Sequence, residues 1–142
     1  MLTPSRFISV EIVIKTDGDC EAFVDWFRAQ DNYVEKIPCD THRWYAYFAP
    51  LPSDSADATV RNICEGIPGW PEVVRKQWDE AAFRELFVGY EVGTDPIAHL
   101  DHFAPGTLEL AARYGAGIGF AFYPSTMGGS DESLNEERQN KS

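Results

Sequence analysis

The chain is poor in cysteine, and its cysteines do not form a close pair. Cys20, Cys39 and Cys64 are odd in number and have no C-x-x-C spacing, which argues against a disulfide framework and a cysteine-based zinc site. Cys20 and Cys64 fall on apolar stripes of expected helices and are predicted to be small buried hydrophobes. Cys39 lies three residues before His42, but no third orienting group accompanies this thiol and imidazole, so we do not expect a nucleophile there.

Long hydrophobic runs are also missing. The apolar stretches fall far short of the roughly 20 residues that cross a bilayer. The opening residues, MLTPSRF, do not place an apolar segment after a basic one, as a secretory leader would. We therefore expect a cytoplasmic protein that does not bind membranes.

Positive charge is scarce. Lysine and arginine total 12 against 23 aspartates and glutamates, a net charge of −11. Residues 1–130 alone hold 19 acidic and 10 basic side chains, so the acidity belongs to the folded body. Such a surface repels phosphate backbones and anionic lipid, which argues against direct nucleic-acid binding. Such a surface would attract a basic protein partner, or it would serve only to keep the chain in solution.

Catalytic signatures are absent as well. The chain contains neither a G-x-x-x-x-G-K phosphate loop nor a G-x-S-x-G nucleophile turn. The glycines of GAGIG, residues 115–119, precede an expected strand, whereas a dinucleotide loop follows one. We expect no cofactor and no catalytic residues.

One short stretch, AHLDHFAPG at residues 98–106, carries two histidines near two aspartates. On a helix, Asp95, His99 and His102 would share one face and could bind zinc or iron. Pro96 and Pro105 bracket a segment too short for a stable helix, and the H-E-x-x-H pattern of zinc proteases is missing. A surface loop is the favoured interpretation, and the metal site is kept as an alternative.

What the chain does contain is a series of strand-like segments with helix-like segments between them. Period-two patterns predict strands, the clearest being RFISVEIVIKT, where Ile8, Val10, Ile12 and Ile14 share one apolar face. Apolar residues at helical spacing predict helices between the strands. Strands are expected over residues 6–16, 42–49, 83–92 and 117–124, and helices after Asp17 or Asp19, after Ser55 or Asp57, from about Glu72 and from Pro105.

These elements predict one α+β domain over residues 1–124. Helices on one face of an approximately four-stranded sheet would give a two-layer α/β sandwich, with a ferredoxin-like arrangement as the first model. Residues 125–142 are mostly polar and lack aromatics, so they are predicted to be a disordered tail.

The other face of this sheet is expected to mix aromatic rings with carboxylates. Trp70 lies in the proline- and glycine-rich turn GIPGWP, where core burial is not guaranteed. Tyrosine and tryptophan bury large rigid areas at low entropic cost and dominate binding hot spots. The predicted protein-binding residues are Glu11, Tyr45, Tyr47, Trp70, Glu85, Phe87 and Tyr123.

The segment PGTLELAARYGAGIGFAFY, with RWYAYF and the opening strand before it, resembles a bacterial domain family of unknown function over about residues 6–124. The resemblance implies an α/β fold and a bacterial or phage origin, and it assigns no site residue. In physical type the chain is also similar to the immunity proteins that neutralise bacterial toxins.

The sequence therefore predicts a non-catalytic binding domain, such as an immunity protein or inhibitor, which docks an acidic and aromatic surface on a basic partner. Two alternatives stay open. One is a metal-dependent enzyme that uses the histidine loop, and the other is a small-molecule sensor that uses the aromatic sheet face. Oligomeric state is left open.

Overall fold

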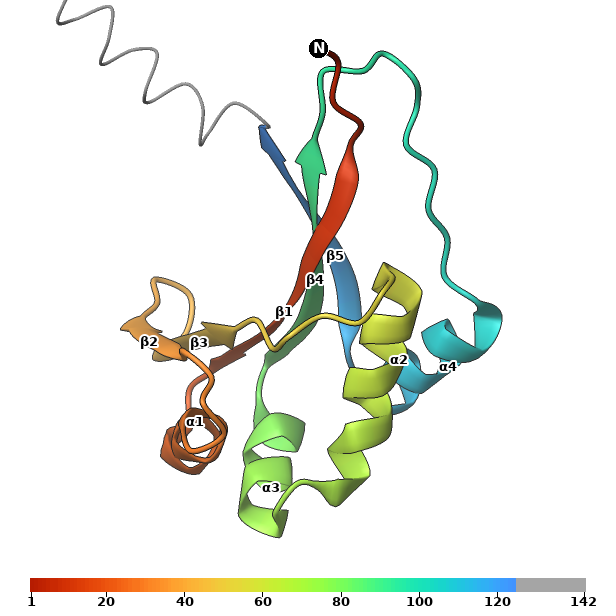
Figure 1. The fold of residues 1–142 in the computed structure, drawn as a ribbon. Helices are drawn as coiled ribbons and strands as arrows, with labels where there is room; N and C mark the ends of the chain where they lie inside the picture. Colours follow the sequence, from red (N-terminus) through yellow and green to blue (C-terminus); the bar gives the residue numbers. More distant parts are fainter. Residues whose placement is uncertain (125–142) are drawn as a thin grey trace, which may run out of the picture.

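The computed structural model describes residues 1–124, so the predicted tail at 125–142 lies outside the described residues. Strands and helices alternate as expected, and the body is of the α+β class (Figure 1). The elements are β1 (Arg6–Thr16), α1 (Glu21–Arg28), β2 (Glu35–Pro38), β3 (Trp44–Phe48), α2 (Ala56–Gly66), the short 3₁₀ helix η1 (Ile67–Gly69), α3 (Glu72–Glu80), β4 (Phe83–Val92), α4 (Pro105–Arg113) and β5 (Gly117–Pro124).

The sheet has five strands in the order β2-β3-β1-β4-β5. Neighbours are antiparallel except β4 and β5, which are parallel, so the sheet is mixed. The expected count of four is wrong because β2 lies in a stretch predicted to be a loop. Its sequence, EKIP, is too short and too polar to show a period of two, and backbone pairing with β3 holds it in the sheet.

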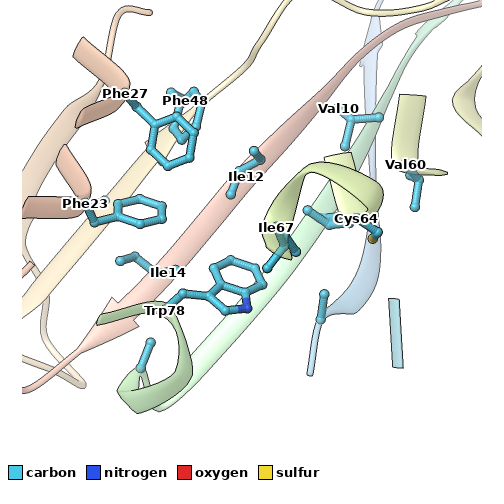
Figure 2. Close-up of a cluster of buried hydrophobic side chains, with 14 of the residues drawn as sticks. Val10, Ile12, Ile14, Phe23, Phe27, Phe48, Val60, Cys64, Ile67 and Trp78 are labelled. Carbon is cyan, nitrogen blue, oxygen red and sulfur yellow. The ribbon is translucent and has the colours of Figure 1, made fainter. Parts of the chain in front are cut away.

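The hydrophobic core lies between the helices and one face of the sheet. Alternate residues of β1, Val10, Ile12 and Ile14, point into this layer and are at most 2% exposed. The helices place Phe23, Phe27, Val60, Cys64, Ile67 and Trp78 around them (Figure 2). As predicted, Cys20 and Cys64 are buried, and burial raises the pKa of Cys64 to about 11.

Trp78 of α3 ties the helical layer to the end of α4. Its side chain is fully buried, and its indole Nε1–H donates to the carbonyl oxygen of Tyr114 at 2.9 Å. The indole nitrogen is thus satisfied inside the core, where an unpaired donor would be costly. The contact fixes the turn from which β5 begins.

Two helix ends follow their local sequence. The Ser55 hydroxyl accepts a hydrogen bond from the backbone N–H of Ala58 and caps α2. Helix α4 ends in a Schellman motif, in which Gly115 N–H donates to Ala112 O and Ala116 N–H donates to Ala111 O. Gly115 has a φ of 72°, the left-handed conformation that favours glycine.

No helix in the described part of the chain is long and apolar enough to cross a membrane.

Replacing Gly115 by alanine is expected to lower the free energy of unfolding by about 1–2 kcal/mol, because a Cβ is disfavoured at positive φ. The new Cβ would also lie 2.7 Å from the Arg84 guanidinium carbon, which must move. Chemical denaturation measures the effect.

Gly106→Ala in α4 is the matched control. Nothing lies within 4 Å of its Cβ position. Alanine favours the helix there, so the free energy of unfolding should rise by roughly 0.5–1 kcal/mol. Equal losses in both variants would contradict the helix-ending role of Gly115.

Candidate functional site

The side of the sheet away from the helices carries the predicted acidic and aromatic residues. The strand register places Glu11 opposite Phe87, and Val13 between Tyr47 and Glu85. All predicted binding residues except Trp70 share this side. We call it the open face, and its residues are Arg6, Ser9, Glu11, Val13 and Lys15 of β1, Glu35 and Ile37 of β2, Tyr45 and Tyr47 of β3, Phe83, Glu85, Phe87, Gly89 and Glu91 of β4, and Gly117, Gly119, Ala121 and Tyr123 of β5.

Trp70 is the exception: the structure places it apart from the other predicted binding residues, and its role in binding stays a prediction. The turn after α2 forms η1 and directs the indole back toward the helical layer. There Trp70 packs edge-on against Phe27 at 5.1 Å and Trp78 at 5.6 Å between ring centroids. It is half-buried and packs against the core.

The centre of the open face is a packed aromatic surface. The rings of Tyr45 and Tyr47, both on β3, lie 4.9 Å apart, and Val13 on the neighbouring strand β1 is 0% exposed. The Lys15 ammonium lies 4.9 Å from the centroid of Phe83, within cation–π range. These side chains bury one another in part without a helix above them.

Glycines in β5 allow side chains of β4 to lie across it. A Cβ at Gly119 would meet the Phe87 ring at 2.6 Å, and a Cβ at Gly117 would meet Glu85 Oε2 at 2.8 Å. Both side chains therefore rest on bare backbone. Replacing either glycine would push Phe87 or Glu85 away from this position.

Two hollows of about 310 Å³ each flank the tyrosine pair. The first is mainly apolar, apart from the Lys15 ammonium and the Cys39 thiol. The second has two carboxylates at its rim, and the Tyr33 hydroxyl donates to Glu35 at 2.5 Å. The first is lined by Val13, Lys15, Pro38, Cys39, Tyr45, Phe83 and Phe87, and the second by Glu11, Tyr33, Glu35, Tyr47, Phe48 and Ala49.

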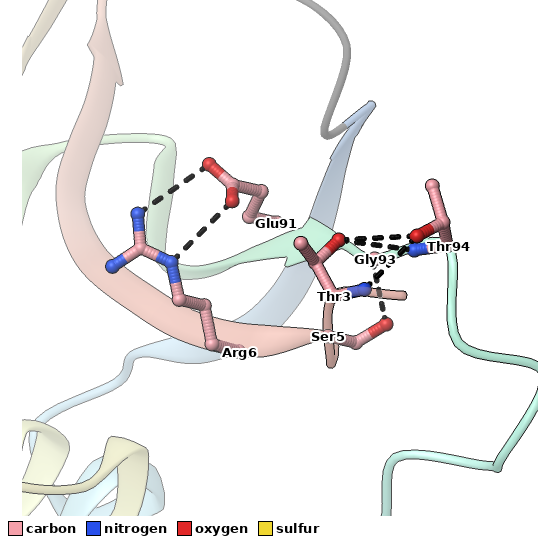
Figure 3. A network of polar contacts seen from close by, with 6 residues as sticks. All are labelled: Thr3, Ser5, Arg6, Glu91, Gly93 and Thr94. Carbon is pink, nitrogen blue, oxygen red and sulfur yellow. Dashed lines mark hydrogen bonds and ion pairs between the residues drawn. The ribbon is translucent and has the colours of Figure 1, made fainter. Parts of the chain in front are cut away.

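Negative charge on the open face is only partly compensated. Arg6 pairs with Glu91 at 3.4 Å, where β1 begins and β4 ends (Figure 3). Among residues 1–124, neither Glu11 nor Glu85 has an ion-pair partner. Burial raises the pKa of both carboxyls. A cation placed beside them would relieve this cost.

Cys39 and His42 make separate contacts. The Cys39 Sγ lies 3.4 Å from the Thr41 hydroxyl, and this hydrogen bond is the main cause that lowers the pKa of Cys39. His42 points elsewhere, with its Nδ1 3.4 Å from Asp17 Oδ2.

The histidine loop does not assemble the alternative metal site. Residues 93–104 are not helical, so the spacing that would align Asp95, His99 and His102 is lost. Asp95 accepts a hydrogen bond from the N–H of Ile97, and His99 rests against the Tyr90 ring at 5.4 Å. Within residues 1–124, no three side chains of ligand type gather where they could hold a metal ion.

The loop instead closes one end of the helical side of the sheet. The Tyr90 hydroxyl donates to Asp101 Oδ2 at 2.7 Å. Burial and this hydrogen bond raise the pKa of Tyr90. Asp101, which lies between the two histidines, thus anchors the loop to β4.

Comparison with protein-family models, curated proteins and solved structures finds no match to this chain. The resemblance to a bacterial domain family stays a prediction.

Several residues on or beside the open face were not predicted from the sequence. Glu35 was missed because β2 was not predicted, Tyr33 because it lies in the loop before β2, and Phe83 because it begins a strand. Val13 was placed on this face by alternation, but its complete burial depends on rings from the neighbouring strands. Only the register could have revealed that burial.

Glu11→Gln is expected to stabilise the fold at neutral pH. Folding raises the pKa of Glu11 above its ordinary 4.5, so protonation favours the folded state. That favourable contribution is complete below pH 4.5 and is lost as the pH rises through the folded pKa. Glutamine stays neutral, so its advantage should be small at about pH 4 and larger at about pH 7 in chemical denaturation.

The control is Glu65→Gln, which removes an exposed carboxylate of α2. Equal gains for Glu11→Gln at both pH values would show that charge burial is not the cause.

Proposed function

We propose that this chain is a non-catalytic protein-binding domain that docks its open face on a basic partner. The observation that carries the proposal is the meeting of two features on one face. Its aromatic rings are prepacked, and two of its carboxylates, Glu11 and Glu85, are partly buried and unpaired among the described residues.

Charge and aromatic area would contribute to binding in different ways. A net charge of −11 steers a basic partner toward the chain and speeds the encounter. Tyr45 and Tyr47 then supply rigid apolar area, and the two hollows can receive side chains of the partner. Lysine or arginine entering the second hollow would meet Glu11 and Glu35 together with two tyrosine rings.

We further propose the class of protein and its place in the cell. An acidic domain whose binding surface is formed in advance suits an immunity protein or inhibitor, which must capture its target quickly. The resemblance noted above favours a bacterial or phage source, and the composition favours the cytoplasm. In the fold, β2-β3-β1-β4, with every neighbouring pair antiparallel, supports a ferredoxin-like unit to which α4 and β5 are added.

Immobilised full-length chain, incubated with a lysate of its native host, is expected to retain a basic protein that high salt releases. With that protein purified, Tyr47→Ala should weaken binding by about 2 kcal/mol, roughly 30-fold, as expected for a hot-spot ring. Glu85→Gln should slow association and flatten its salt dependence. Binding should also weaken as the pH falls, because protonation of Glu11 and Glu85 begins at raised pKa values.

Matched controls lie on the helical side. Val73→Ala and Glu65→Gln remove an exposed apolar and an exposed acidic side chain there, and neither should change the affinity. The proposal fails if no protein is retained at low salt, or if Glu65→Gln weakens binding as much as Glu85→Gln.

A further inference from the structure

The two edges of the sheet differ in how they are protected. β2 is four residues long and carries Glu35, Lys36 and Pro38, features that discourage pairing with another strand. β5 has eight residues, GIGFAFYP, none of them charged. Within residues 1–124, β5 pairs with β4 alone, so its outer backbone edge is free.

Aromatic side chains of β5 are also exposed. Phe120 and Phe122 are 52% and 66% exposed. They border a hollow of about 360 Å³, the most apolar of the surface hollows described here, which is lined by Ser5, Tyr90, Val92, His99, Asp101, Phe120 and Phe122. Figure 1 shows that the end of β5 extends beyond α2 and α4.

The chain's own C-terminal segment does not suit this edge. Residues 125–142 follow β5 directly, but Met127 and Leu134 are their only large apolar side chains, and the segment has four acidic and two basic residues. A basic partner does not suit the edge either, because β5 offers it no charge. The occupant must present an uncharged, apolar strand.

A second copy of this chain meets that requirement. Two chains of charge −11 repel one another over most of their surfaces. Residues 114–130 hold no charged side chain, so this is where two copies can approach with the least repulsion. The same strand supplies the free backbone edge that the other copy needs.

We propose that two copies associate through β5, edge to edge and antiparallel, to form one continuous sheet. A two-fold axis at Phe120 pairs the strand along its length. Ile118 then faces Phe122 of the other copy, Gly119 faces Ala121, and Gly117 faces Tyr123, so large residues meet smaller ones. The association uses the sheet edge, and the open face stays available to a basic partner.

The mass of the full chain in solution tests the proposal. Light scattering coupled to gel filtration should give twice 16.0 kDa at micromolar to millimolar concentration. High salt should preserve or strengthen the dimer, because it screens repulsion and favours apolar burial. Phe122→Lys should give 16.0 kDa and a folded circular-dichroism spectrum, with a melting temperature lowered by the loss of the dimer and of the ring stacking on Tyr90. Leu51→Lys, which changes a residue that is 96% exposed outside the sheet, should stay dimeric.

A disulfide checks the register. In a Cys39→Ser background, which removes the cysteine that is not buried, Phe120→Cys should cross-link two copies under mild oxidation, because residues opposite one another at the axis lie within disulfide range. Leu51→Cys should not cross-link.

A wild-type mass of 16.0 kDa throughout would overturn the proposal, as would a Phe122→Lys variant that is still dimeric. The outcome is separate from that of the proposed function, since Phe122→Lys should still bind the basic partner and Tyr47→Ala should still dimerise.

Discussion

The one-sided packing of the helices is the constraint on which the other features depend. Side chains of β1 point alternately to the two faces of the sheet, and Val10, Ile12 and Ile14 are buried under the helices. Val13, on the other side of the same strand, is buried without any helix above it. Aromatic side chains of β3 and β4, Tyr45, Phe83 and Phe87, lie around Val13 and take the place of a helix there.

This arrangement places carboxylates beside apolar rings. Glu11 and Glu85 would be better solvated elsewhere, and burial raises their pKa values. A surface kept only for solubility gains nothing from partly burying its acids. A docking surface does gain, because a cation of the partner replaces the interaction with water that the two carboxylates have lost. The same carboxylates also favour a partner of positive charge.

The local pattern of apolar residues predicts most of the helices and strands. The strand that was not predicted, β2, depends on pairing with residues that are distant in the sequence. Strands such as 83–92 and 117–124 follow directly from their alternation. β2 has no such pattern, since Glu35 and Lys36 enter the sheet only because β3 offers an edge. Trp70 shows the same limit, because its direction is set by η1 and by the rings around it. The predicted open-face residues were located by period two alone, whereas the hollows between them depend on register.

The central claim is that the open face, and not the helical side, meets the partner. Carbodiimide labelling read by mass spectrometry tests it directly, by comparing each carboxylate in the free chain and in the purified complex. The account predicts that labelling of Glu11 and Glu85 falls on binding while Glu65 and Glu80 stay reactive. Loss of labelling at Glu65 and Glu80, with Glu11 and Glu85 unchanged, would contradict it.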